Sequence, residues 1–222
     1  MVCHPLFSWS CLLIPPNMTM MVFGYIDRWV FILELLEAIQ QRRSIRKFTE
    51  QTVDKGLVQE LIDVSVWAPS ASNGQPWGFV IVQDQAYLKE LSDAAKSGIL
   101  EKINVLPALE QYRSSMENQA FNIFYNAPTL VIFYGKKDDP HTDHDCSMAA
   151  QNFMLAAREK ELGTCWIGFA EAVCTSDEFK TKHHIPEDYK LVAPIILGYP
   201  DHFPQNSISR KDYPVFSWVT NN

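Results

Sequence analysis

Two short segments hold the residues best suited to chemistry in this chain of 222 residues. The first, residues 42–46 (Arg42-Arg43-Ser44-Ile45-Arg46), places three guanidinium groups and a hydroxyl within five residues. Arginine binds phosphate through paired hydrogen bonds and keeps its charge when it is partly buried. The segment therefore predicts a site for a phosphate ester, with a solvated helix end as the alternative.

The second segment, residues 69–77 (PSASNGQPW), is a small polar loop that ends in an aromatic residue. Its hydroxyl and amide side chains both donate and accept hydrogen bonds, as a planar heterocycle edged with donors and acceptors requires. A helix-to-strand turn has a similar composition, so the loop alone leaves both interpretations open. Together the two segments indicate a phosphorylated, flat, heteroaromatic ligand.

These segments resemble motifs of the FMN-dependent nitroreductase family. Further matches follow in the order of the family pattern, at residues 163–169 (GTCWIGF), 197–200 (LGYP) and 209–211 (SRK). The similarity extends from about Leu33 to the C-terminus. It implies a nitroreductase-like α+β fold, in which helices sandwich a central mixed sheet, and a homodimer with FMN at its interface.

The resemblance also implies which residues bind the cofactor. For the phosphate and ribityl chain they are Arg42, Arg43, Ser44, Arg210 and Lys211. Arg46 matches a position where the family places a cation near N1 and O2 of the flavin. A fixed cation there would stabilise the negative charge that reduction leaves on the ring.

Two more segments complete the implied site. A loop that reaches the flavin from the partner subunit would contribute Pro69, Ser70 and Ala71, whereas Asn73 and Gln75 would make hydrogen bonds to the ribityl chain and within the loop. The segment along the isoalloxazine ring would contribute Cys165, Trp166, Ile167 and Gly168. In this alignment the amide of Ile167 is the donor that faces N5, whereas Trp166 has core packing as its alternative role.

The implied activity is an oxidoreductase that takes hydride from NADH or NADPH. It would reduce nitroaromatics, quinones or similar planar acceptors by a ping-pong mechanism, with no side chain as nucleophile and Arg46 as charge stabiliser. A flavin-binding sensor or carrier without turnover is an alternative, because fold does not guarantee activity. Relatives that fragment flavin or reductively dehalogenate aromatic amino acids are another. The chain has no Rossmann glycine fingerprint, so we expect nicotinamide to bind only transiently over the flavin.

Composition narrows the class of protein. The net charge of −7 argues against a nucleic-acid binder, since such proteins usually carry a basic excess. The five cysteines form no CxxC pair and no even disulfide framework, which favours a reducing cytoplasm. Cys165 is expected to be a buried apolar filler rather than a nucleophile. His141 and His144 have no second ligand cluster, so we expect no metal site.

Residues 1–31 predict an N-terminal extension to a single FMN-binding domain over residues 32–222. The apolar stretches of the extension are broken by Pro15-Pro16 and Asp27-Arg28. Neither piece reaches the roughly 20 apolar residues that a membrane-spanning helix needs. The extension also lacks the basic start and cleavage site of a secretory signal. A misplaced translation start and a lineage-specific segment are the favoured explanations, and an interfacial membrane anchor is the third alternative.

Apolar spacing predicts the elements that must position these residues. An amphipathic helix at 32–41 would deliver the arginine cluster at its C-terminal end. The strand at 77–82 is apolar on both faces, which predicts a central position in the sheet. Pro194 within a strand at 190–198 predicts an edge or a bulge. A helix at 145–162 would be closed by Gly163. The remaining expected helices are 53–67, 85–97, 106–125 and 175–182, and the remaining strands are 129–134 and 164–168.

Overall fold

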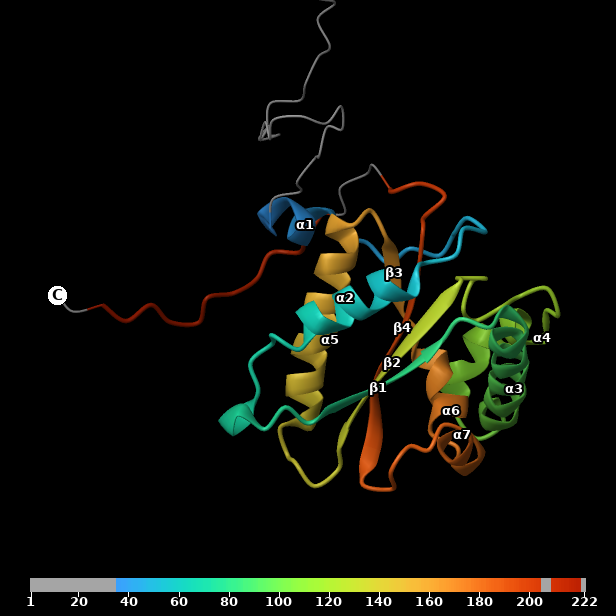
Figure 1. The fold of residues 1–222 in the computed structure, drawn as a ribbon. Helices are drawn as coiled ribbons and strands as arrows, with labels where there is room; N and C mark the ends of the chain where they lie inside the picture. Colours follow the sequence, from blue (N-terminus) through green and yellow to red (C-terminus); the bar gives the residue numbers. More distant parts are fainter. Residues whose placement is uncertain (1–34, 205–208, 221–222) are drawn as a thin grey trace, which may run out of the picture.

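The computed structural model describes residues 35–204 and 209–220, so the expected extension over residues 1–31 lies outside the described part. A sheet of four strands lies at the centre, in the order β1-β2-β4-β3 (Figure 1). Its strands are β1 (Trp77–Val82), β2 (Thr129–Lys136), β3 (Gly163–Trp166) and β4 (Tyr189–Gly198). All three strand pairs are antiparallel. Within the described residues, the parallel pairing that a mixed sheet requires is confined to one isolated bridge, Ser44 to Thr164.

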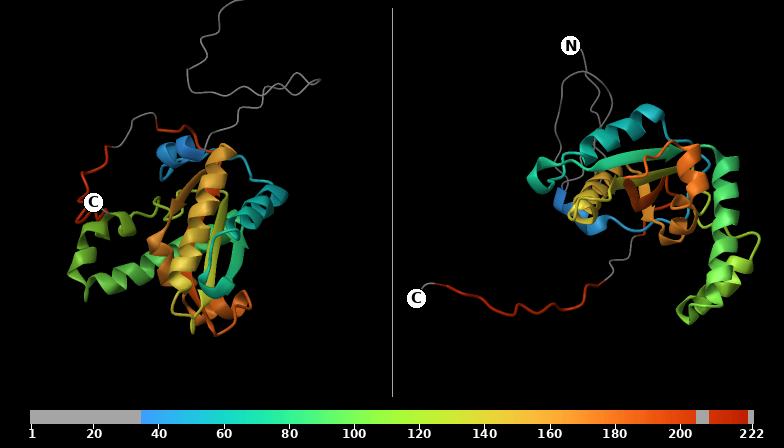
Figure 2. Two further views of the ribbon diagram at one scale, coloured as in Figure 1. Left: turned by 90° about the vertical axis from the view of Figure 1, so that its left-hand side faces the viewer. Right: turned by 90° about the horizontal axis from the view of Figure 1, so that it is seen from below.

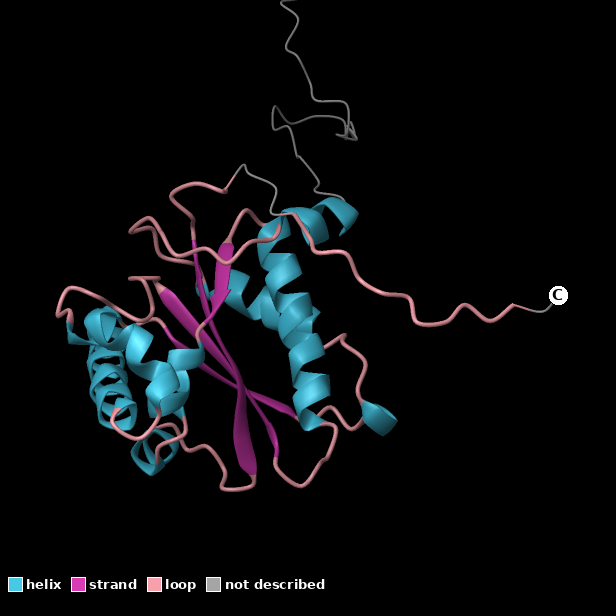
Figure 3. Cartoon of the chain, turned by 180° about the vertical axis from the view of Figure 1, so that it is seen from behind, coloured by secondary structure: helices cyan, strands magenta, loops and turns pink. Residues whose placement is uncertain are grey.

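Helices cover both faces of this sheet (Figure 3). On one face lie α2 (Lys55–Ser65) and α5 (Thr142–Glu159), with α1 (Leu35–Gln41) across one end of α5. On the other face lie α3 (Gln85–Ile103), α4 (Arg113–Glu117), α6 (Glu171–Cys174) and α7 (Asp177–Lys182). Short 3₁₀ turns are η1 (Ala71–Asn73), η2 (Pro107–Tyr112) and η3 (Gly168–Ala170). The expected α+β sandwich is confirmed.

The core follows from the alternation of β2. Side chains along a strand point to opposite faces in turn. Leu130 and Ile132 therefore pack on the α3 side, and Val131 and Phe133 on the α5 side. All four are 0% exposed, so β2 is buried on both faces and reads in sequence as a continuous apolar run.

The strand at 77–82 is correctly placed but is not central. β1 pairs only with β2 and forms one edge of the sheet in the described chain. The prediction was wrong because apolar residues on both faces of a strand indicate only that helices cover both faces. Side-chain composition does not show whether the strand has a hydrogen-bonded neighbour on each side.

Pro194 lies in an inner strand, because β4 pairs with both β2 and β3. The hydrogen-bonded pairs between β3 and β4 end at Trp166 and Ile195, one residue before Pro194 is reached. The missing backbone N–H of Pro194 therefore breaks no hydrogen bond to β3. The register between β2 and β4 shifts next to this point, between Phe133 and Tyr134. The expected bulge is present nearby, and the expected edge position is wrong.

The end of α5 differs from its prediction in a way that matters for the site. Glu161 takes the left-handed conformation (φ 59°) after the helix, and the amide of Leu162 donates to the carbonyl of Ala157 at 2.8 Å. This is the pattern of a Schellman cap, so Gly163 does not close the helix. Glycine is needed at 163 for another reason: a Cβ there would lie 2.8 Å from side-chain atoms of Ile45.

The other helices follow their predictions in part. The stretch expected to be helical at 106–125 contains only η2 and α4, and the chain from Asn118 to Asn126 is a loop. In that loop Tyr125 and Asn126 have positive φ values of 54° and 57°. These conformations interrupt a helix, although the local sequence has helical apolar spacing.

Two apolar surfaces of the described chain pack on nothing within it. On α1, which ends at Gln41 as expected, Leu35 and Leu36 are 65% and 72% exposed. Residues 209–220 extend away from the body from the α1 end of the molecule (Figure 1, Figure 2). Phe216 and Trp218 of this C-terminal tail are 95% and 82% exposed. Apolar side chains displayed in this way mark an interaction surface.

Candidate functional site

Three arginines from the two ends of the described chain meet beside the end of α1. Burial, followed by the charges of Arg43 and Arg210, lowers the pKa of Arg42. Arg43 folds back on the chain and donates to the carbonyl of Arg42 at 2.9 Å, and its Nε is buried without a partner among the described residues. These cations repel one another, so an anion bound among them would relieve the repulsion.

The segment after these arginines is tied to β3. The amide of Ile45 donates to the carbonyl of Thr164 at 2.9 Å, next to the bridge between Ser44 and Thr164. Ile45 is 4% exposed and fills the space that Gly163 leaves free. The arginine segment and β3 therefore lie side by side, as a site built from both requires.

Cys165 lies within this arrangement. Its thiol is 2% exposed, and burial raises its pKa, although Arg46, Ser44 and Arg42 act in the opposite direction. These influences place all three side chains close to the sulfur. The expected burial of Cys165 is confirmed, and its raised pKa leaves little thiolate for nucleophilic chemistry.

The chain after Cys165 emerges at the surface. Trp166 is 39% exposed, which rules out the alternative of a core tryptophan. A Cβ on Gly168 would meet nothing within 4 Å. The amide of Ile167, expected to face a ligand, instead donates to the carbonyl of Pro194 at 2.9 Å. Within the described part of the chain, the amide of Gly168 has no hydrogen-bond acceptor.

Arg46 follows the bridge between Ser44 and Thr164 at the same end of the sheet. It is exposed and forms no ion pair among the described residues. Its guanidinium carbon lies 5.8 Å from the centre of the Tyr125 ring, close enough for a cation–π contact. The positive charge of Arg46 is therefore exposed, and no ion pair within the described residues neutralises it.

The loop at 69–75 is built from strained backbone. Ser72, Asn73 and Gln75 have φ values of 51°, 55° and 45°, which side chains other than glycine rarely adopt. The amide of Gln75 donates to Oγ of Ser70 at 3.0 Å, and its side-chain nitrogen donates to Asn73 at 3.0 Å. The amide of Ala71 donates to a carboxylate oxygen of Asp145 at 3.1 Å.

The loop and the arginines lie at opposite ends of α5 (Figure 1). Asp145, near the start of α5, contacts Ala71, whereas Arg158, near its end, donates to Gln41 at 2.8 Å beside the arginine cluster. The 13 residues from Asp145 to Arg158 span about 20 Å at about 1.5 Å per residue. One chain thus brings together only part of the predicted site. The residues of the arginine segment, of the segment after Gly163 and of the C-terminal tail lie at one end of α5: Arg42, Arg43, Ser44, Arg46, Cys165, Trp166, Ile167, Gly168 and Arg210, with Lys211 next to Arg210 in the chain. The loop residues lie at the other end of α5: Pro69, Ser70, Ala71, Asn73 and Gln75.

Sequence reasoning missed Asp145 and Tyr125. An acidic residue in the first turn of a helix usually interacts favourably with the helix dipole, so Asp145 gave no sign of a further role. In the structure it is buried, with 2% of its surface exposed. The signal for Tyr125 was also weak, because its loop had been assigned to a helix. Neither contact is encoded by local sequence, since each joins segments far apart in the chain.

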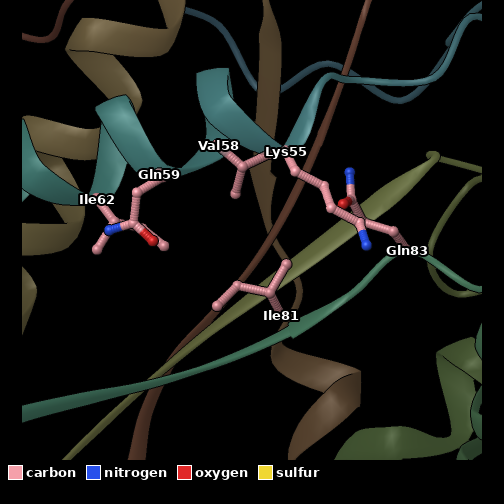
Figure 4. A pocket seen from close by; sticks show the side chains of 6 residues that line it. All are labelled: Lys55, Val58, Gln59, Ile62, Ile81 and Gln83. Atoms are coloured by element: carbon pink, nitrogen blue, oxygen red, sulfur yellow. The ribbon is translucent and has the colours of Figure 1, made fainter.

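A hollow of about 280 Å³ lies elsewhere, between α2 and β1 (Figure 4). Val58 and Ile62 line it from α2, and Ile81 from β1, with Lys55 as its cation. Since β1 is the edge of the sheet opposite to β3, this hollow is not part of the arginine site. Its size is also below the range typical of cofactor pockets.

No helix in the described residues is long and apolar enough to cross a membrane.

A model of the Nitroreductase family matches residues 39–199 of the chain, which therefore belongs to that family. A protein of Methanothermobacter thermautotrophicus, provisionally named NADH dehydrogenase/NAD(P)H nitroreductase, is 29% identical over 180 residues, covering 81% of this chain and 84% of the relative. The iodotyrosine deiodinase of Thermotoga neapolitana is 24% identical over 191 residues, covering 78% and 95%. The structure of an FMN-dependent nitroreductase from Clostridium difficile R20291 has a TM-score of 0.68 at 28% identity, covering 82% of this chain and 99% of that one.

Proposed function

We propose that this chain is an FMN-dependent oxidoreductase that uses NAD(P)H to reduce nitroaromatics, quinones or similar planar acceptors. The observation that carries the proposal is that the positively charged side chains of Arg42, Arg43 and Arg210 lie near one another. Family membership and the names of the relatives support the same activity. When bound, FMN would supply the hydride chemistry, and the protein supplies orientation and charge.

The residues of the arginine site fit the phosphate end of FMN. Arg42 and Arg210 provide guanidinium forks, and Ser44 provides a hydroxyl beside them. The buried Nε of Arg43 lacks a partner among the described residues, so it has a donor to offer. Lys211 follows Arg210 in the chain and is exposed. Charge-assisted hydrogen bonds of this kind are the strong ones in protein sites.

The surface formed by residues 165–168 fits the ring of the cofactor. Trp166 offers an apolar face, and Gly168 leaves space for close approach of a planar group. The free amide of Gly168 is the donor available to a ring nitrogen, because that of Ile167 is bonded to Pro194. Arg46 would stabilise negative charge on the reduced ring. The hydride donor, NAD(P)H, and the substrate that is reduced would bind to this open surface in turn, which gives ping-pong kinetics.

The test is spectroscopic and anaerobic. We expect purified protein to show a flavin spectrum with one FMN per chain, and NADH or NADPH to bleach it in stopped flow. Added nitroaromatic or quinone should restore the colour. A spectrum that nicotinamide leaves unchanged would favour a flavin carrier, and colourless protein that binds no added FMN would refute the proposal. The likeness to iodotyrosine deiodinase makes 3-iodotyrosine the second acceptor to assay.

The active form is proposed to be a homodimer that shares two FMN sites. The arginines and the loop at 69–75 lie at opposite ends of α5 in one chain, so a site that uses both needs two chains. The exposed apolar residues of α1 and of the C-terminal tail give such a dimer surface to bury, and pairs of this kind are the commonest oligomer. Light scattering that shows a monomer binding FMN tightly would contradict this.

Mixed dimers provide a sharper test. Arg42→Glu breaks the phosphate side of a site, and Ser70→Trp breaks the loop. If the two sides come from different chains, a dimer of one Arg42→Glu chain and one Ser70→Trp chain has one intact site and one doubly altered site. We expect one FMN per mixed dimer and none in either parent. No FMN in the mixed dimer would place both sides in the same chain.

A cytoplasmic location is part of the same proposal. Cys146, Cys165 and Cys174 are free thiols in the described chain, as is usual in a reducing compartment.

A further inference from the structure

One hydrogen bond links residues 70–75 of the strained loop to another segment, and the next residue, Pro76, accepts from the amide of Lys136 in β2 at 3.2 Å. Among the described residues, the amide of Ala71 is the one group within 70–75 that bonds to another segment, and its acceptor is Asp145 at 3.1 Å. Asp145 is 2% exposed and lies in the first turn of α5, where the helix dipole favours its charge. A bond from an amide to a carboxylate is stronger than one between neutral groups.

The conformation of the loop requires such a link. Ser72, Asn73 and Gln75 all have positive φ within four residues, and each such residue costs free energy that the surroundings must offset. Ser72 through Gln75 are exposed, so core packing does not hold them. The internal bonds of the loop stabilise its shape, but they do not attach it to the sheet or to α5.

We infer that Asp145 is a positioning residue for the FMN site of the partner subunit. It holds the amide of Ala71, and through it the loop that the proposed dimer places against the cofactor of the other chain. Asp145 itself touches no cofactor in this arrangement. The inference rests on the proposed function, because it assigns Asp145 a role in a shared FMN site.

The first experiment compares three single variants in the full-length dimer. Asp145→Ala removes the acceptor and should weaken FMN binding about tenfold to a hundredfold, as expected for the loss of a hydrogen bond to a charged group. Asp145→Asn keeps an acceptor oxygen of the same reach but loses the charge, so it should lose clearly less affinity than Asp145→Ala. Asp143→Ala is the matched control, because Asp143 lies in the same turn but is exposed and pairs with Lys190 at 2.9 Å. It should bind FMN as the wild type does. The readout is the dissociation constant from flavin-fluorescence quenching, with circular dichroism and dimer mass as checks on folding.

A second variant removes the same bond from the loop side. Ala71→Pro eliminates the donor, and the preceding Ser70 already has φ −137° and ψ 150°, which suit a residue before proline. Ala71 is also the first residue of η1, a position that tolerates proline. If one bond carries the effect, Asp145→Ala and Ala71→Pro combined should lose no more affinity than the worse single variant. Additive losses would overturn the inference.

Hydrogen exchange tests the link without reference to FMN. In Asp145→Ala the amides of 70–75 should exchange faster than in the wild type, whereas those of β2 should not change. Suppose that the wild type binds FMN but that Asp145→Ala changes neither hydrogen exchange in the loop nor FMN affinity, or only one of the two. The inference about Asp145 is then overturned, whereas the proposed function still stands. If the wild type binds no FMN at all, the proposed function fails and the inference fails with it.

Discussion

Arg42→Gln should separate cofactor binding from stability. Burial lowers the pKa of half-buried Arg42, and the charges of Arg43 and Arg210 lower it further, so the charge of Arg42 is unfavourable in the chain alone. The substitution removes that repulsion together with the guanidinium. We expect the free energy of unfolding of the FMN-free protein to change by less than about 1 kcal/mol, since solvent screens partly exposed charges.

The effect on FMN should be much larger. A hydrogen bond between charged groups contributes about 1.5–3 kcal/mol, and each 1.36 kcal/mol is about a factor of ten in the dissociation constant. Arg42→Gln should therefore weaken FMN binding roughly tenfold to 150-fold. Arg42→Lys should lose less, because it keeps the charge but not the planar fork.

Fluorescence titration of FMN-free protein measures the affinity, and urea unfolding measures the stability. Arg113→Gln is the control, because Arg113 is partly exposed and pairs with Glu110 at 2.7 Å, outside the arginine site. It should leave FMN affinity unchanged. An Arg42→Gln protein that binds FMN within twofold of the wild type would refute the assignment of the phosphate site. Equal losses in both variants would refute it too.

Three further predictions follow from buried groups. Gly163→Ala would place a methyl group 2.8 Å from Ile45 and should lower the free energy of unfolding by about 1–3 kcal/mol in urea titration. Burial lowers the pKa of His183, so the unfolded chain binds its proton more readily; stability should fall as pH drops below about 6.5, and His183→Gln should flatten that slope. Burial raises the pKa of Cys146 and Cys174 to about 12, so neither thiol should react with a disulfide reagent before the protein unfolds.

The elements were predictable where one segment carries its own signal. The apolar run of β2 and the amphipathic pattern of α2 placed both elements to within two residues at every end. The arginine segment was recognised as a candidate phosphate site, because guanidinium groups bind phosphate through paired hydrogen bonds. Local composition was sufficient in these cases since the residues that determine the structure are neighbours in sequence.

Prediction failed where a residue serves a distant partner. Gly163 was interpreted as a helix cap because glycine usually follows a helix, yet Glu161 takes that role and Gly163 makes room for Ile45. Ile167 was aligned as a free donor, but its amide bonds to Pro194 at 2.9 Å, beyond the end of the β3 ladder. No pattern within either segment records which strand will lie beside it.

The placement of α5 links these local features to the assembly. Its first turns hold Ala71 through Asp145, and its last turn holds α1 through the bond from Arg158 to Gln41. A rigid helix keeps these two points about 20 Å apart, so they cannot close on one cofactor within the chain. In the proposed dimer, α5 of each chain therefore positions the phosphate side of one site and the loop of the other. In that dimer the length of this helix would set the spacing between the two sites, and the buried carboxylate at its start would hold the loop of one site while the arginines near its end bind the phosphate of the other.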